Sequence, residues 1–149
     1  KVDRLRKAID ASGEVIDKDK KRLKFIKAAI KSYPNLDITL LETISSLEDT
    51  IDGINILLYG DPSLSSRDIE QKESIASKVG IIIWNMWRSR SNPTKTNEKL
   101  YQIASSDFEK LITKIQNLDN SIKEIENYLE KNEVPFTPGR GLILNWKKE

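Results

Sequence analysis

The last long segment of the chain carries an apolar residue at every third or fourth position. The members of this stripe are Leu100, Ala104, Phe108, Leu111, Ile115, Leu118, Ile122, Ile125 and Leu129. This spacing places all of them on one face of an α-helix, and such a face must be buried against other helices. The pattern predicts a helix over residues 95–132, about 55 Å long at about 1.5 Å per residue.

Three earlier segments have similar stripes and predict helices over residues 2–33, 38–59 and 66–90. Pro34 ends the first segment, and Gly60 followed by Asp61-Pro62 ends the second, since these residues interrupt helices. Asp19 lies within the apolar stripe of the first segment. We interpret it as a residue that sets register or a bend rather than as a ligand.

The third segment is crowded with apolar residues between Val79 and Trp87, so this half is expected to be buried nearly all round. The run Ile81-Ile82-Ile83 is β-branched and is also compatible with a strand. No convincing partner strand occurs elsewhere in the sequence. The length of the segment therefore favours a buried helix.

Four amphipathic helices with short connections predict an all-α fold, an antiparallel up-down-up-down four-helix bundle over residues 1–132. The first and fourth helices are longer than the other two, and we expect them to project beyond the compact part or to meet a partner. Residues 133–149 form a tail with Pro and Gly, expected to pack on the bundle or on a partner.

Composition excludes several kinds of chemistry. The 149 residues contain no His and no Cys, which rules out imidazole and thiolate sites for catalysis or metal binding. Acidic groups such as Glu126 and Glu130 have lysines close by in sequence, and the basic run that includes Arg22 has Asp17 and Asp19 beside it. We interpret all of these as solvated faces. We therefore expect no catalytic residue, no cofactor and no metal.

Partners are constrained by charge and hydropathy. A net charge of +2 argues against nucleic-acid binding, and no apolar stretch is long enough to span a membrane. The sequence starts at Lys1 without Met, so we expect a processed product or part of a longer polypeptide. The remaining partners are another protein, a neighbouring domain or a second copy of the chain.

Candidate interface residues fall in two regions. The first contains Trp84, Trp87, Arg88, Arg90, Asn92 and Tyr101, and the second contains Phe136, Arg140 and Trp146. Trp, Arg and Tyr are the residue types that dominate protein interfaces. Large aromatic residues more often serve the core, so burial of Trp84 and Trp87 in the bundle is the favoured interpretation and an interface role is the alternative.

Several short motifs in the second half of the chain resemble one family. They are Asp61-Pro62, residues 74–80, Trp84-Asn85-Met86-Trp87, residues 92–96, residues 101–104 with Phe108, and residues 134–140. In order and spacing this region is similar to the C-terminal helical region of bacterial exported β-propeller proteins related to sortilin, which are often labelled glycosyl hydrolases. Residues 1–60 match only as generic amphipathic helix.

The resemblance implies an accessory role. In such proteins the propeller would hold any glycan-processing or ligand-binding surface, and the helical region would lie beside it. The resemblance supplies no catalytic residue for this chain, and any hydrolase label would belong to the parent protein. It implies an exported protein of the periplasm or cell envelope. We therefore expect a non-catalytic helical interaction module, with a free-standing helical adaptor or assembly protein of the cell envelope as the alternative.

Overall fold

The structure is a computed structural model that describes residues 1–33, 35–65, 72–88 and 94–141. Its helices are α1 (Val2–Ser32), α2 (Thr39–Tyr59), α3 (Pro62–Ser65), α4 (Ile75–Arg88) and α5 (Lys95–Lys131). No strand occurs in the described part of the chain, and Ile81, Ile82 and Ile83 lie within α4. The all-α prediction is confirmed.

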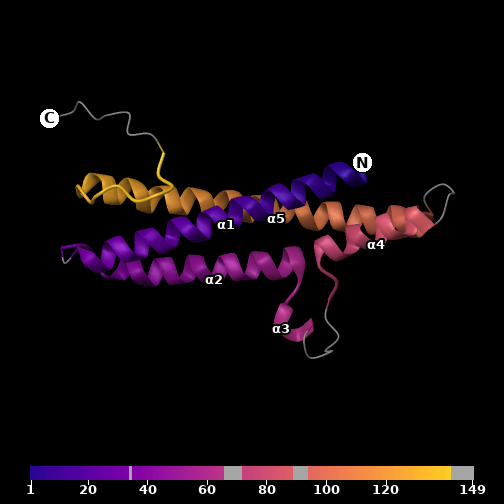
Figure 1. The fold of residues 1–149 in the computed structure, drawn as a ribbon, viewed down its shortest axis with the longest axis horizontal. Helices are drawn as coiled ribbons and strands as arrows, with labels where there is room; N and C mark the ends of the chain where they lie inside the picture. Colours follow the sequence, from indigo (N-terminus) through magenta and orange to yellow (C-terminus); the bar gives the residue numbers. More distant parts are fainter. Residues whose placement is uncertain (34, 66–71, 89–93, 142–149) are drawn as a thin grey trace.

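The two longest helices, α1 and α5, run side by side in the same direction (Figure 1). Val2 and Tyr101, each near the start of its helix, line the same groove, whereas Arg22 further along α1 bonds Glu126 further along α5. Helix α2 runs the opposite way (Figure 1), since Lys20 pairs with Asp52 whereas Lys27, later in α1, pairs with Glu48, earlier in α2. The chain therefore runs out along α1, back along α2 and then α4, and out again along α5.

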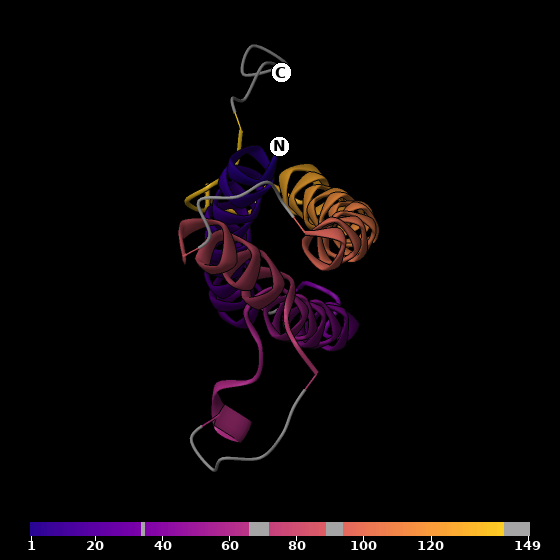
Figure 2. The same ribbon diagram turned by 90° about the vertical axis from the view of Figure 1, so that its right-hand side faces the viewer.

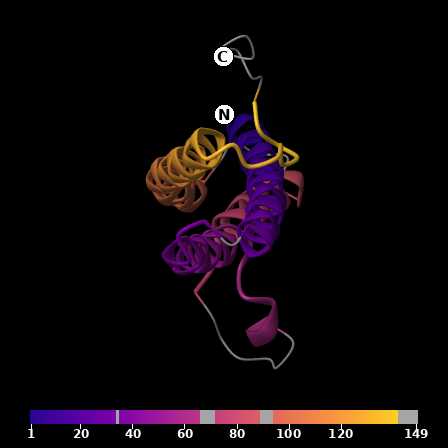
Figure 3. The same cartoon turned by 90° about the vertical axis from the view of Figure 1, so that its left-hand side faces the viewer.

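Two helices in succession, α2 and then α4, pack beside the pair formed by α1 and α5. Along the long axis of the molecule, α4 begins near the place where α2 ends, and both run in the same direction (Figure 1). Viewed from one end, α4 lies in front beside α1 and α5 (Figure 2). Viewed from the other end, α2 takes that place (Figure 3). At either end, the long helices are accompanied by one further helix.

The up-down-up-down four-helix bundle is therefore not confirmed. That topology needs the chain to reverse direction after α2, and it would make α1 antiparallel to α5. Instead, α3 projects from the body between α2 and α4, and the chain then continues in the direction of α2 (Figure 1). Helices α1 and α5 do not project as a bare pair, since α2 covers one half of them and α4 the other.

Helix α4 begins later than the sequence pattern predicts. Residues 72–74 are not helical, and the Ser74 hydroxyl accepts a hydrogen bond of 3.1 Å from the backbone N–H of Ser77. Ser74 thus acts as the N-cap of a helix of 14 residues. The start predicted at residue 66 lies outside the described residues.

One apolar core runs the length of the molecule. Its fully buried members include Ile16, Leu23 and Ile26 of α1, Ile44, Ile51 and Leu58 of α2, Ile82 of α4, and Leu111, Ile122 and Leu129 of α5. The stripe on α5 is buried from Ala104 to Leu129. After α5 the tail turns back, and Val134 and Thr137 are buried.

Candidate interaction surface

Two exposed tryptophans form the most prominent apolar feature of α4. Trp84 is 55% exposed and Trp87 is 77% exposed, and Met86 beside them is 44% exposed. The three-residue spacing puts both indoles on one side of the helix, where they stack with ring centroids 5.8 Å apart and planes 29° apart. The Arg88 guanidinium lies 6.0 Å from the centre of the Trp84 ring, a distance that allows a cation–π interaction. We call Trp84, Met86, Trp87 and Arg88 the aromatic surface.

The exposure of this surface corrects two expectations. The second half of α4 is not buried nearly all round, and the tryptophans do not serve the core. Only Val79 and Ile82 of that half are fully buried. The reason is topological. Helix α4 begins near the place where α2 ends along the axis, so the later turns of α4 extend beyond α2 (Figure 1).

Polar contacts hold this end of α4 against α5. The side-chain amide of Asn85 donates a hydrogen bond of 3.1 Å to the amide oxygen of Asn97, which is 5% exposed. The Thr94 hydroxyl caps α5 by accepting a hydrogen bond of 3.3 Å from the backbone N–H of Asn97. Asn85 adjoins Trp84, so the backbone that presents the aromatic surface is fixed.

A groove adjoins the aromatic surface where α1, α4 and α5 meet. Its volume is about 570 Å³. It is lined by Lys1, Val2 and Asp3 of α1, Ile82, Ile83 and Met86 of α4, and Asn97, Glu98, Tyr101 and Gln102 of α5. Met86 belongs to both features, so the aromatic surface continues into this groove.

The other predicted interface residues lie in different places. Tyr101 is half-buried, packs against the core and lines the groove that adjoins the aromatic surface. Phe136 is 56% exposed, but it belongs to the tail beyond α5, and the end of α5 lies at the opposite end of the molecule from α4 (Figure 1). The Arg140 side chain is buried there and donates a hydrogen bond of 3.2 Å to Glu130. Arg90, Asn92 and Trp146 lie outside the described residues.

Replacing Trp87 by Ala is expected to change the free energy of unfolding by less than about 0.5 kcal/mol, because the side chain is mostly in water. Ile82→Ala is the matched control on the same helix. Ile82 is 1% exposed, and its truncation should cost about 2–5 kcal/mol. Urea unfolding followed by far-UV circular dichroism measures both. A loss above about 2 kcal/mol for Trp87→Ala would contradict the exposed placement.

The sequence interpretation missed a buried cluster of charged side chains around Arg22. Arg22 was assigned to a solvated basic face, but its side chain is 8% exposed. Its guanidinium donates to Asp19 at 2.7 Å, to Asp119 at 2.8 Å, and to both oxygens of Glu126 at 3.0 and 2.8 Å. We call these four residues the Arg22 centre.

The Arg22 centre corrects the interpretation of its carboxylates as well. Asp19 does lie in the stripe of α1, but it is 1% exposed and has an ionic partner. Glu126 pairs with Arg22 instead of belonging to a solvated face, while Glu130 remains exposed and bonds Arg140. Asp19 and Arg22 are three positions apart on a helix, and this spacing was the one sequence feature that could have indicated their ion pair.

The pKa values within the Arg22 centre shift in different directions. Hydrogen bonds to Glu126, then to Asp119 and Asp19, outweigh burial and raise the pKa of Arg22 above its ordinary value. Burial raises the pKa of Asp19 despite its contact with Arg22. Burial also opposes ionisation of Asp119, but hydrogen bonds from Lys123 and Arg22 outweigh it and lower its pKa. The four groups together position α1 against α5.

These opposite shifts predict opposite pH dependences for two variants. The lowered pKa of Asp119 gives stability that is present above its ordinary pKa of 3.8 and is lost as pH falls through the lower folded value. The stability difference between wild type and Asp119→Asn should therefore shrink below about pH 4. The raised pKa of Asp19 has the opposite effect on stability. The free energy of unfolding of wild type minus that of Asp19→Asn should therefore rise as pH falls. Urea unfolding at pH 3 to 7 measures both, and parallel curves would contradict the assignment.

The tail closes over the Arg22 centre. Gly139 has φ +96°, and a Cβ there would lie 2.5 Å from Cγ of Arg22. The backbone N–H of Val134 donates to the carbonyl of Leu129 at 3.1 Å, which turns the chain back at the end of α5. Gly139 is therefore required both for its backbone conformation and for its close approach to Arg22.

Other classes of site were sought within the described residues. In that part of the chain no group of three or more acidic side chains is arranged to hold a metal ion. None of the described helices is long and apolar enough to cross a membrane. No family model matches this chain, and no curated protein or solved structure matches it either.

Proposed function

We propose that this chain is a non-catalytic helical interaction module that binds a protein partner through the aromatic surface on α4. The observation that carries the proposal is the exposure of Trp84 and Trp87 side by side. Single exposed apolar residues such as Ile38 are ordinary on protein surfaces. Two adjacent tryptophans with a neighbouring Met and Arg have the composition of an interface centre.

The free energy available from this surface is sufficient for specific binding. An aromatic side chain buries about 150–250 Å² when covered, at about 25 cal/mol per Å². Trp87 is 77% exposed, so covering its exposed part would contribute roughly 3–5 kcal/mol before the costs of association. Trp84 and Met86 add to it, and the Asn85–Asn97 hydrogen bond holds α4 in place beforehand.

The proposed partner is a propeller-type domain of the same exported polypeptide, in the periplasm or cell envelope, as the sequence resemblance implies. One structural detail supports this choice. Lys1 and Val2 line the same groove as Met86, so a domain attached ahead of Lys1 would emerge beside the aromatic surface. Any glycan-processing activity would then belong to that domain, and this chain would support it by packing.

The test is binding of the separately produced domain encoded ahead of Lys1, measured by isothermal titration calorimetry. The double variant Trp84→Ala/Trp87→Ala should weaken binding by about 2 kcal/mol or more, roughly 30-fold. Phe136→Ala is the matched control, an exposed aromatic residue at the opposite end that should leave binding unchanged. A coding region without such a domain would contradict the proposal. So would an equal loss in both variants.

Light scattering of the isolated chain distinguishes the proposed function from the alternative, a free-standing adaptor. A free-standing adaptor that assembles with itself would give a dimer or larger species, and the tryptophan variant would dissociate it. The proposed module should instead be a monomer when its partner domain is absent. A stable homo-oligomer held by Trp84 and Trp87 would contradict the proposed function and would favour self-assembly.

A further inference from the structure

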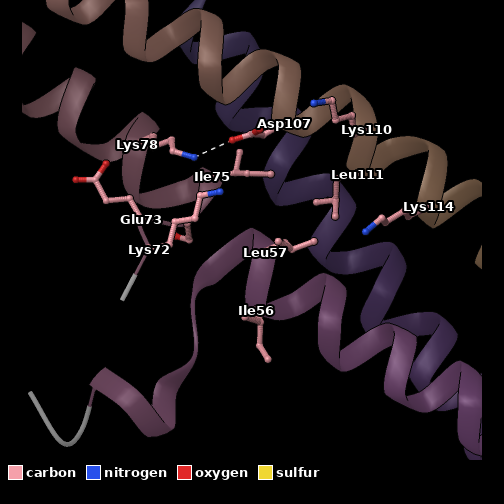
Figure 4. Close-up of a pocket in the computed structure, with 11 residues that line it drawn as sticks. Ile56, Leu57, Lys72, Glu73, Ile75, Lys78, Asp107, Lys110, Leu111 and Lys114 are labelled. Carbon is pink, nitrogen blue, oxygen red and sulfur yellow. Dashed lines mark hydrogen bonds and ion pairs between the residues drawn. The ribbon is translucent and has the colours of Figure 1, made fainter. Parts of the chain in front are cut away.

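A second groove lies between the end of α2, the start of α4 and the part of α5 around Leu111. Its volume is about 310 Å³. Apolar side chains from three helices line it, namely Leu57 of α2, Ile75 of α4 and Leu111 of α5 (Figure 4). The groove exists because α2 ends before α4 begins, which leaves a gap beside α5. It shares no residue with the aromatic surface.

Four lysines surround this apolar lining. Lys72 lies in the segment just before α4, Lys78 lies in the first turn of α4, and Lys110 and Lys114 come from α5 (Figure 4). Lys78 is buried and bonds Asp107 at 2.8 Å. Within the described residues, the other three lysines have no ion pair. Their amino groups are therefore available to a bound anion.

Acidic residues do not neutralise the groove. Asp107 and Glu73 are its two carboxylates against four lysines, which leaves an excess of two positive charges. Asp107 is already bonded to Lys78. The Glu73 carboxylate points away from α5 (Figure 4). Hydrogen bonding by Lys78, aided by the charges of Lys72 and Lys110, lowers the pKa of Asp107, so the groups share one electrostatic environment.

The lysines and the exposed apolar residue of this groove do not stabilise the fold. Lys110 and Lys114 are four positions apart on α5, and like charges at that spacing destabilise a helix. Leu57 is 47% exposed at the groove although it is a large apolar residue. Positive charge beside uncovered apolar surface favours a ligand that has both negative charge and an apolar part.

We propose that this groove binds a small anionic amphiphile, a molecule with one carboxylate, sulfate or phosphate group on an apolar body. The positive charges of Lys72, Lys110 and Lys114 around the rim attract the oxyanion, and the apolar body covers Leu57 and the side chains beneath it. The groove has the volume of a small-molecule site and is too small for a protein segment with its own fold. This site is independent of the aromatic surface and of the proposed function.

The test uses 8-anilinonaphthalene-1-sulfonate, a fluorescent sulfonate with an apolar body, titrated into the full chain. Binding should be saturable at one site. Decanoate should displace the dye, whereas inorganic sulfate and decylammonium should not, because each of these lacks one of the two required features. Equal displacement by decylammonium would overturn the proposal, as would the absence of saturable binding.

Two double variants locate the site. Lys110→Gln/Lys114→Gln should weaken dye and decanoate binding about tenfold, a change that corresponds to the loss of two charge-assisted contacts. The control Lys24→Gln/Lys99→Gln removes the same net charge from exposed positions outside the groove and should bind as the wild type does. Leu57→Asn should weaken binding without changing net charge. Equal weakening in the control would show that the anion is attracted by the net charge of the chain and not by this groove, and it would contradict the proposal.

Discussion

Arg22→Met lowers the free energy of unfolding by about 3–5 kcal/mol, which is the expected cost of leaving buried carboxylates without their cation. Arg22 is the shared partner of Asp19, Asp119 and Glu126, and only Asp119 keeps another cation, Lys123. Urea unfolding at pH 7 followed by circular dichroism measures the loss. Lys20→Met is the control. It removes an ion pair with Asp52 in which both side chains are more than half exposed, and it should change stability by less than about 1 kcal/mol.

Two further measurements identify the cause of that loss. Adding Glu126→Leu to Arg22→Met should restore part of the stability, because the second change removes a carboxylate that the first left unpaired. Lowering the pH towards 3 should also reduce the deficit of Arg22→Met, since protonated carboxyl groups no longer need a cation. A deficit that is unchanged by both would indicate lost packing of the Arg22 stem instead of unpaired charge.

Gly139→Ala is expected to cost about 2–4 kcal/mol. A left-handed backbone conformation costs an L-residue about 1–2 kcal/mol, and forcing a methyl group into a filled space costs a similar amount. Gly139 has φ +96°, and the added Cβ would lie 2.5 Å from Arg22. Urea unfolding gives the global effect. Hydrogen exchange at Val134 and Arg140, whose backbone N–H groups bond Leu129 and Thr137, reports detachment of the tail.

Gly141→Ala is the matched control for this experiment. Gly141 lies two residues further along, and a Cβ there meets nothing within 4 Å. Its replacement should be neutral or slightly stabilising, because Ala restricts the unfolded chain more than Gly does. If both glycine variants behaved alike, the contact between the tail and the Arg22 centre would not contribute to stability. The tail would then be a passive extension of α5.

The aromatic surface shows which parts of a surface can be predicted from residue types alone. Trp84, Trp87 and Arg88 are predicted as interface residues from their chemistry and spacing, and the structure places them together and in solvent. Tyr101 and Phe136 have similar chemistry, but Tyr101 packs against the core and Phe136 lies at the opposite end. A sequence pattern assigns a side chain to a helix face. Whether another helix covers that face depends on the paths of the other segments.

Local pattern determined the helices of this protein, because the alternation of apolar and polar residues and the caps around each helix act over a few positions. The stripes on α1, α2 and α5 define the faces that are buried. Tertiary structure alone decided the direction of the chain after α2, since an amphipathic stripe can be buried by a parallel or an antiparallel neighbour. That decision made α1 parallel to α5, brought Arg22 to Glu126 across 104 positions of sequence, and left both tryptophans of α4 in water.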